Sequence, residues 1–359
     1  MKILFRVDSS TQIGTGHLMR CLTLAAEAKK REWDVCFVIR DASQKVLNFI
    51  KSYGFLVKPV TTTPKTQIEK KNDNNDRNWL AVGQETDAVE TLEEVCKFKA
   101  NWVVVDHYTL DATWHKLVMQ ECISMLVIDD LGNRKIHSDL LLDHNLSANV
   151  GKYADLVSAN CKLLLGLKFA LLRDDFRILR KRSLQRRTNT KVEKILITMG
   201  GVDIENYTLS VLRELSKNSF AKKCKFTVIV GNLYPHLDDL KDFVFSSKLK
   251  IRILSDVMNM AEILSNADLC IGAAGSSAWE RCCLGLPSIT LAIADNQIEI
   301  AQSLNDNNMA LFSNLSDLQN DFEKFFHYSR KDLIQNMTAS MLSACDGLGA
   351  LRVLDNLEK

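Results

Sequence analysis

The stretch that decides the fold runs from Ile3 to His17 and reads ILFRVDSSTQIGTGH. Its first part, Ile3–Val7, is a short apolar run that stops at polar residues, which is typical of a buried strand in a parallel sheet. Gly14 and Gly16 let the backbone turn tightly, and the apolar spacing from Leu18 to Lys30 predicts a helix directly after them. A strand, a glycine loop and a helix in this order indicate the first unit of an α/β fold.

This alternation continues along the whole chain, with a further helix expected over Val46–Tyr53. The other expected strands are Val35–Ile39, Trp102–Val105, Leu126–Ile128, Ile195–Thr198, Phe226–Val230, Ile251–Leu254, Leu269–Ile271 and Ser288–Leu291. They form two series, which predict two Rossmann-like α/β domains, residues 1–175 and 176–359. The change from the first series of strands to the second falls near the basic stretch 180–190. Because no aromatic residues are interleaved there, a solvated helix and linker is favoured over a phosphate or nucleic-acid site.

Composition narrows the functional class. The chain has 359 residues and an apolar fraction of 46%, enough for two full cores, and its net charge of +2 favours neither a nucleic-acid nor a membrane partner. No apolar run approaches the roughly 18 residues of a membrane-spanning helix, and Met1–Arg6 has no signal-peptide core. The ten cysteines include no C-x-x-C pair, so free thiols in the cytoplasm are expected.

The first motif that carries chemistry is Gly14-Thr15-Gly16-His17. It departs from the dinucleotide fingerprint because Met19 occupies the third glycine position, so NAD binding is not expected. His17 falls in the first turn of the predicted helix, where the positive helix end disfavours a charged ring. A neutral imidazole accepts a proton from water, which makes His17 a candidate general base. The alternative is a histidine that only caps the loop.

Polar residues at the end of the first strand converge on this motif. Asp8 and Ser10 stand there, and Gly14 and Gly16 bring the backbone close to any ligand. We therefore expect all four to contribute to substrate binding. Two roles stay open for Asp8, which either orients the His17 ring or only holds the loop.

The second motif lies in the second domain. Small residues over 272–275 are followed by Ser276 and Ser277 at a predicted helix start, an arrangement that favours a diphosphate. Glu280 comes one turn later, where a carboxylate accepts both hydroxyls of a ribose or, alternatively, only complements the helix dipole. Asn296 and Gln297 are expected to open the next helix and to offer amide groups to sugar hydroxyls.

A third glycine loop, Met199-Gly200-Gly201-Val202-Asp203, opens the second domain. Gly200 and Gly201 are expected to meet the phosphates, although an ordinary strand-to-helix turn gives the same pattern. No H-x-E or H-E-x-x-H pattern and no carboxylate cluster predicts a metal site, so neither a metal nor a cofactor is expected.

Together these motifs resemble a known family. The stretch Phe5–His17 resembles the opening of the UDP-2,4-diacetamido-2,4,6-trideoxy-β-L-altropyranose hydrolases of pseudaminic acid biosynthesis. The similarity continues at Asp106-His107-Tyr108, Leu165–Arg173, Met199–Asp203 and Asn296-Gln297. The second half also resembles inverting glycosyltransferases of the B fold. After about residue 310 no part of the family pattern is matched.

The resemblance implies two domains that face each other across a cleft, cleavage of the sugar C1–O bond with inversion, and release of UDP. It implies that His17 matches the family's catalytic histidine and that Tyr108 and Asn296 line the sugar pocket. A UDP-sugar is then the expected partner, with no nucleic acid and no membrane insertion, while the oligomeric state stays open and a monomer is one alternative. Two alternatives stay open: a B-fold glycosyltransferase that uses a UDP-sugar donor, and a non-catalytic protein that binds sugar nucleotides.

Overall fold

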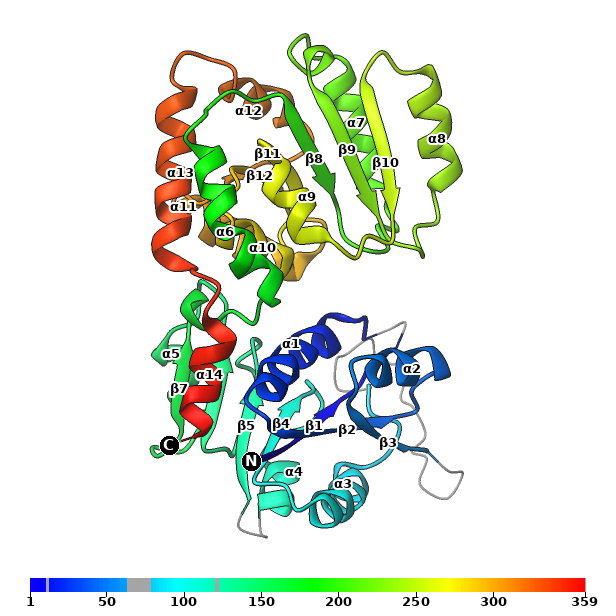
Figure 1. The fold of residues 1–359 in the computed structure, drawn as a ribbon, viewed down its shortest axis with the longest axis vertical. Helices are drawn as coiled ribbons and strands as arrows, with labels where there is room; N and C mark the ends of the chain where they lie inside the picture. The colour runs from blue at the N-terminus through cyan, green and yellow to red at the C-terminus, as the bar shows by residue number, and fades with distance from the viewer. Residues whose placement is uncertain (11–12, 63–78, 120–122, 359) are drawn as a thin grey trace. The chain divides into compact units, whose positions relative to one another are not determined.

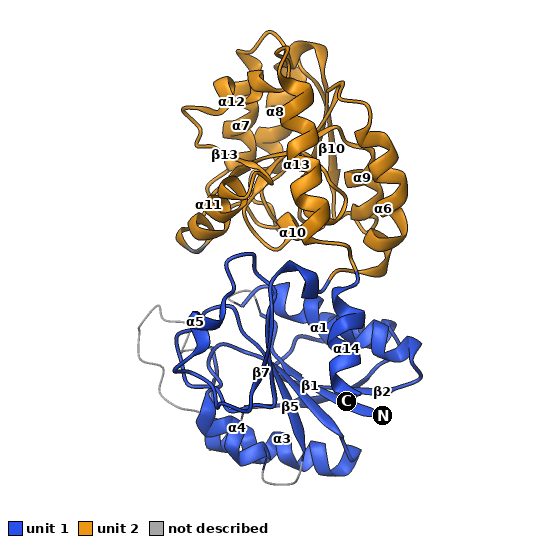
Figure 2. Ribbon diagram, turned by 90° about the vertical axis from the view of Figure 1, so that its left-hand side faces the viewer, with its two compact units in different colours: residues 1–171, 348–359 blue, residues 172–347 orange. Residues whose placement is uncertain are grey.

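A computed structural model describes residues 1–10, 13–62, 79–119 and 123–358. The chain divides into two compact units, which Figure 2 colours separately. Unit 1 comprises Met1–Leu171 and Leu348–Lys359, and unit 2 comprises Leu172–Gly347. Residues 61–76 are polar, which predicts a surface loop, and from residue 63 on this stretch lies outside the described residues.

Unit 1 is built on a sheet of seven parallel strands in the order β3-β2-β1-β4-β5-β6-β7 (Figure 1). The strands are β1 Lys2–Val7, β2 Asp34–Arg40, β3 Leu56–Val60, β4 Trp102–Asp106, β5 Ser124–Ile128, β6 Leu140–Asp143 and β7 Lys162–Leu165. Strand order departs from chain order between β1 and β4, where β1 pairs with β2 on one side and β4 on the other. Such a switch is where the ends of parallel strands leave room for a ligand.

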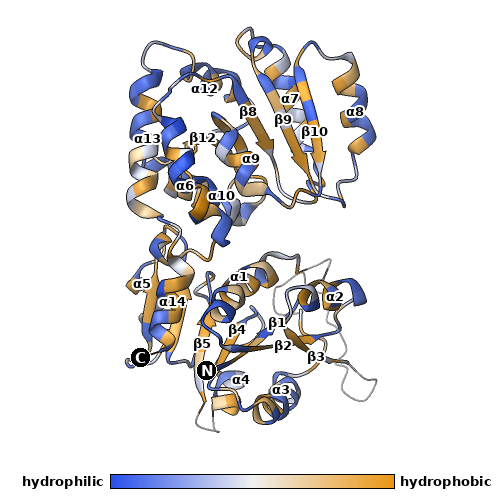
Figure 3. Ribbon diagram, viewed as in Figure 1, coloured by the Kyte–Doolittle hydropathy of each residue, from blue (hydrophilic) through white to orange (hydrophobic). Residues whose placement is uncertain are grey.

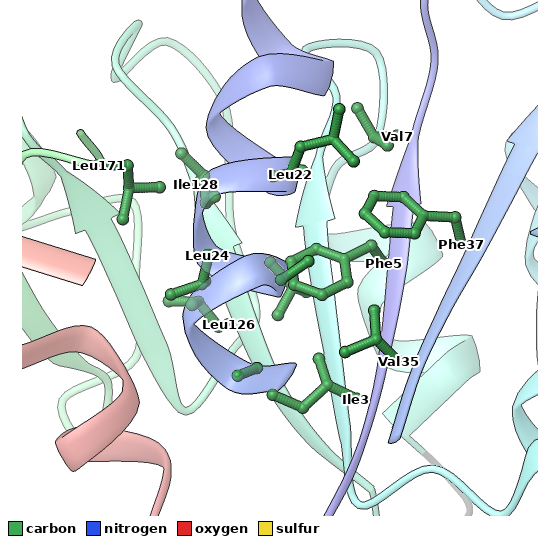
Figure 4. Packing of buried hydrophobic residues seen from close by; sticks show 14 of the residues in the cluster. Ile3, Phe5, Val7, Leu22, Leu24, Val35, Phe37, Leu126, Ile128 and Leu171 are labelled. Atoms are coloured by element: carbon green, nitrogen blue, oxygen red, sulfur yellow. The ribbon is translucent and has the colours of Figure 1, made fainter. Parts of the chain in front are cut away.

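Helices cover both faces of this sheet, and each face has its own apolar core. The helices are α1 Gly16–Lys30, α2 Gln44–Ser52, α3 Gln84–Phe98, α4 Ala112–Val118, α5 Val150–Tyr153 and α14 Gly349–Leu357, with the short turn η3 Leu167–Phe169. Figure 4 shows the core beneath α1, where Leu22 and Leu24 pack with Phe5, Phe37 and Leu126. This packing fixes the first turn of α1 beside the strand ends.

Unit 2 has a sheet of six parallel strands in the order β10-β9-β8-β11-β12-β13. The strands are β8 Lys194–Thr198, β9 Lys225–Val230, β10 Lys250–Ser255, β11 Leu269–Ala273, β12 Ser288–Leu291 and β13 Leu311–Phe312. Its helices are α6 Asp174–Arg187, α7 Tyr207–Ser216, α8 Leu237–Ser246, α9 Met260–Asn266, α10 Ser277–Cys283, α11 Ile298–Asp306, α12 Leu318–Lys324 and α13 Arg330–Ala344, with the turns η4 Ala221–Lys223 and η5 Asp295–Gln297. Hydrophobic colour gathers along the strands of both sheets in Figure 3.

The expected strands are present, and the α/β class is confirmed. The strands β3, β6, β7 and β13 were missed. They are short, and β3 contains Pro59, which the edge position of this strand tolerates.

The stretch 180–190 is helical up to Arg187, as expected, but it lies within unit 2 and does not link the two units. Its residues up to Arg187 complete α6 inside unit 2, where Arg180 and Arg187 donate to backbone carbonyls, among them those of Cys345 and Leu264. The boundary between the units was expected after residue 175. In the structure it lies four residues earlier, between Leu171 and Leu172. The last helix, α14, belongs to unit 1 because it packs against α1.

Candidate active site

The carboxyl ends of the parallel strands β1, β4 and β5 lie together at one end of the unit 1 sheet (Figure 1). Acidic residues from distant parts of the sequence stand at these strand ends. Asp8 follows β1, Asp106 ends β4 and Asp130 follows β5. The glycine loop returns the chain to this edge, so α1 begins above it and presents His17 and Arg20 one turn apart. The site therefore forms where the strand ends that carry the acidic residues meet the first turn of α1.

His17 is paired with a carboxylate. Its Nδ1 lies 2.6 Å from Oδ1 of Asp106, and the residue is only 8% exposed. An anionic oxygen at this distance accepts a hydrogen bond from the Nδ1–H group, which leaves Nε2 as the basic nitrogen. Burial opposes ionisation of Asp106, but the charge of Arg20 and the hydrogen bonds from Arg20 and His17 outweigh it and hold the pKa of this carboxyl well below its ordinary value. The pair thus presents an oriented base.

Arg20 connects this pair to a second carboxylate. Its Nε and Nη2 donate to the two oxygens of Asp106 at 2.5 and 2.6 Å, and its Nη1 donates to Asp130 at 3.0 Å. The same Nη2 lies 3.1 Å from Nδ1 of His17. All of these groups are at least partly buried, so solvent screens their interactions weakly.

Aromatic rings surround the imidazole. Tyr108 meets His17 edge to face at 4.5 Å between ring centroids, and its hydroxyl donates to Asp130. Trp79 lies 5.7 Å from His17 and 5.3 Å from Tyr108. The structure therefore places Tyr108, predicted to line a sugar pocket, in direct contact with the candidate base, and it adds a tryptophan that sequence reasoning missed.

Asp8 belongs to a neighbouring buried network. Its carboxylate accepts two hydrogen bonds from Arg6, at 2.5 and 3.0 Å, and one from the backbone amide of Arg40 at 2.8 Å. Arg6 in turn binds Asp87 on α3. Of the two roles left open for Asp8, orienting the ring falls to Asp106, which contacts His17, whereas the bonds of Asp8 join the ends of β1 and β2.

The glycine loop is closed by its own hydrogen bonds. The amide of Gly14 donates to the carbonyl of Ser10 at 2.8 Å, and the Ser10 hydroxyl accepts from the amide of Ile13 at 3.1 Å. Gly14 has a φ of +76°, a backbone conformation that residues other than glycine rarely adopt. Gly16 is exposed at the start of α1, so the backbone here is open to a ligand.

In unit 2 the loop after β8 exposes Gly200 and Gly201. A Cβ atom at position 231 would lie 2.1 Å from the carbonyl oxygen of Gly201, so only glycine fits at position 231. The Asp203 carboxylate accepts from the amides of Tyr207 and Thr208 and ties the loop to α7. The result is a fixed turn with bare backbone at its tip.

The loop after β11 is supported from beneath by an arginine that sequence reasoning did not select. Arg281 is 2% exposed, donates to the carbonyl of Ala273 at 3.0 Å and lies 3.3 Å from the hydroxyl of Ser277. Ser276 is exposed and its side chain does not cap α10. The two serines therefore stand at the helix start, as predicted from the small-residue loop.

Glu280 lies one turn further along α10 and is half-buried. Burial raises its pKa to about 7, against the weaker opposing effects of Arg173 and Arg281. Asn296 and Gln297 form the turn η5 immediately before α11, close to their expected place at a helix start. The side-chain oxygen of Gln297 accepts from the amide of Ile293 at 3.2 Å.

Among the described residues, no group of three histidine, cysteine, aspartate or glutamate side chains is placed to hold a metal ion. Within the same ranges, no helix has both the length and the apolar character needed to cross a membrane. The expectation that catalysis needs no metal stays a prediction.

Two parallel sheets, each with glycine loops at its carboxyl edge, define a protein of the glycosyltransferase B fold, as expected from the sequence. Residues 195–344 match the glycosyltransferase family 28 C-terminal domain. The structure superimposes on Acinetobacter baumannii MurG with a TM-score of 0.69 at 15% identity, covering 100% of this chain and 99% of that one.

The resemblance to the hydrolase family is confirmed. The chain is 27% identical over 300 residues to the UDP-2,4-diacetamido-2,4,6-trideoxy-β-L-altropyranose hydrolase of Campylobacter jejuni, covering 83% of this chain and 93% of that protein. It is also 27% identical over 299 residues to the Methanocaldococcus jannaschii protein MJ1062. That match covers 81% of this chain but only 55% of the archaeal protein.

Proposed function

We propose that this protein hydrolyses a UDP-linked diacetamido-trideoxy sugar at the anomeric C1–O bond with inversion. UDP and the free sugar are the products, and the sugar then enters the synthesis of a nonulosonic acid of the pseudaminic type. The observation that carries the proposal is the buried pair of His17 and Asp106, with its separation of 2.6 Å, in a chain related to a hydrolase of this specificity.

In this reaction His17 acts as the general base. With the Nδ1 proton held by Asp106, Nε2 takes a proton from water while the water oxygen attacks C1 of the sugar. The C1–O bond breaks and its electron pair leaves on the diphosphate of UDP. Because UDP is a good leaving group, no second carboxylic acid is required to protonate it, unlike in an ordinary glycosidase.

The nucleotide is assigned to unit 2. Ser276 and Ser277 are assigned to the diphosphate and Glu280 to the ribose, with backbone amides at Gly200 and Gly201 as further donors. Asn296 and Gln297 are assigned to the sugar, together with Tyr108 of unit 1. The exposed positions of Ser276, Gly200 and Gly201 support this assignment.

One other activity is favoured by a specific observation. The match of residues 195–344 to the glycosyltransferase family 28 C-terminal domain also suits a transferase, in which His17 would deprotonate an acceptor hydroxyl instead of water. A non-catalytic binding protein has less support, because it has no use for a buried histidine–carboxylate pair.

Incubation of the protein with a panel of UDP-sugars, followed by NMR, separates these functions. A hydrolase releases UDP without any acceptor, and the first anomer detected reports retention or inversion. Release of UDP only when an acceptor alcohol is added would establish the transferase. Saturable UDP binding without turnover of any panel member, with or without an acceptor, would leave the binding protein. The assay with and without a chelator also tests the prediction that no metal is needed.

A further inference from the structure

We propose that Arg20 is a positioning residue whose charge disfavours a positive charge on the His17 ring and whose contacts join the ring, through Asp106 and Asp130, to Tyr108. The catalytic part of this inference rests on the proposed function. The state of the ring itself is open to measurement without substrate.

The proposal starts from an electrostatic conflict in the pair of His17 and Asp106. A carboxylate 2.6 Å from Nδ1 orients the ring, but its negative charge also favours a protonated, positive imidazole. A ring that already carries its second proton cannot accept one from water. A fixed positive charge beside the carboxylate counters this effect and keeps the histidine available as a base over a wider pH range.

Arg20 stands where it supplies this compensation. Its Nη2 lies 2.6 Å from the same Asp106 oxygen that contacts His17, and 3.1 Å from Nδ1 of the ring. A fixed positive charge so close disfavours a second positive charge on the imidazole. Because an arginine stays protonated at all ordinary pH values, the compensation does not titrate.

The shape of the guanidinium matters as much as its charge. Nε and Nη2 grip both oxygens of Asp106, while Nη1 reaches Asp130 at 3.0 Å. Asp130 accepts the hydroxyl of Tyr108, whose ring contacts His17. The contacts thus form a closed circuit from His17 through Asp106, Arg20, Asp130 and Tyr108. A lysine has one nitrogen and cannot make these contacts together.

Two of the remaining titratable groups near this circuit carry no charge at neutral pH. Cys21 on α1 lies 3.7 Å from Asp106, and burial raises the pKa of its thiol, so it stays protonated. Burial lowers the pKa of His144, which follows β6, to about 4, so it is neutral at pH 7. The third group, His107 after β4, lies 3.2 Å from Asp8 and belongs to the neighbouring network.

Arg20→Gln provides the direct test. NMR titration of the His17 ring in the full-length protein, without substrate, should show its protonation midpoint at higher pH than in wild type, by roughly one unit or more. The acidic limb of the kcat profile should move in the same direction. Arg31→Gln is the matched control, because Arg31 caps the same helix and pairs with Asp355 at 2.5 Å. It should leave the His17 titration unchanged.

Arg20→Lys keeps the positive charge and removes the branched guanidinium that contacts Asp106 and Asp130 together. Its ring titration should stay near that of wild type, whereas kcat should fall roughly tenfold with little change in KM, a part of the about 10²–10⁴-fold effect of a general base. This variant also serves if Arg20→Gln does not fold. An unmoved midpoint in folded Arg20→Gln, or wild-type kcat in Arg20→Lys, would overturn the proposal. Absence of any turnover in wild type, together with the expected titration shift, would instead refute the proposed function alone.

Discussion

The candidate base in unit 1 and the candidate nucleotide loops in unit 2 differ in how far their side chains are already engaged. At the unit 1 edge, His17, Asp106 and Arg20 are buried or nearly so and bind one another at 2.5–3.1 Å. In unit 2, Ser276 and the two glycines at 200 and 201 are exposed. Glu280 is half-buried, and burial raises the pKa of its carboxyl to about 7.

The difference indicates two ways of preparing a site. The base is organised before any ligand arrives, so its geometry depends little on substrate. The nucleotide loops present a fixed backbone with open polar groups, which a ligand would complete. Mutations in unit 1 should therefore change turnover more than affinity, and mutations in unit 2 should do the reverse.

His17→Asn should give the largest effect. Removal of the general base should lower kcat by roughly 10²–10⁴-fold, while UDP affinity stays near that of wild type because the nucleotide is assigned to unit 2. Steady-state kinetics and calorimetry on the same preparation measure both. If UDP binding is lost while the fold is intact, His17 is a binding residue and the contrast between the units disappears.

Asp106→Asn should come next. The amide keeps the size of the side chain but no longer imposes the protonated Nδ1, so a fraction of the rings present the wrong tautomer. We expect kcat to fall roughly 10²-fold or less, within the range of a general base, with unchanged KM. Asp8→Asn serves as a comparison in the neighbouring network. An equal and selective loss of kcat in that variant would contradict the assignment of Asp106 as the orienting acid.

Glu280→Gln tests the other region. A carboxylate that accepts ribose hydroxyls contributes roughly 1.5–3 kcal/mol, so UDP affinity should weaken about tenfold or more while kcat at saturation changes little. Since the pKa of Glu280 is about 7, wild-type affinity should also decline as the pH falls from 8 to 6. Calorimetry at several pH values should show this slope in wild type and not in the variant. A pH-independent wild-type affinity would remove Glu280 from the ribose site.

The same carboxyl predicts a small effect on stability. Its pKa in the folded protein, about 7, exceeds the ordinary value of 4.5, so the folded state binds the proton more tightly than the unfolded state. The contribution of Glu280 to stability therefore falls as the pH rises from about 4.5 to 7 and is lowest above that range. Ligand-free Glu280→Gln should melt roughly 1–3 °C above wild type at pH 8, with no gain at pH 4. Thermal unfolding followed by circular dichroism measures the difference, and a larger gain at pH 4 than at pH 8 would contradict it.

The sequence by itself determined the elements and the place of the motifs. Apolar runs that stop at polar residues are local patterns, and they located β1, β4 and β11 and the strand ends that carry Asp8 and Asp106. The glycine loop and the apolar spacing after it placed His17 in the first turn of α1. These features depend on neighbouring residues only, so a pattern of a few residues is enough to predict them.

Only the tertiary structure decided which of these groups meet. His17 contacts Asp106, 89 positions away, because β4 lies next to β1 in the sheet. Arg20 reaches Asp130, 110 positions away, because β5 lies next to β4, and its side chain gave no pattern of its own in the sequence. Strand order and helix docking arise from the burial of whole faces, which no local spacing encodes. The partners of the candidate base therefore became identifiable only once the sheet was assembled.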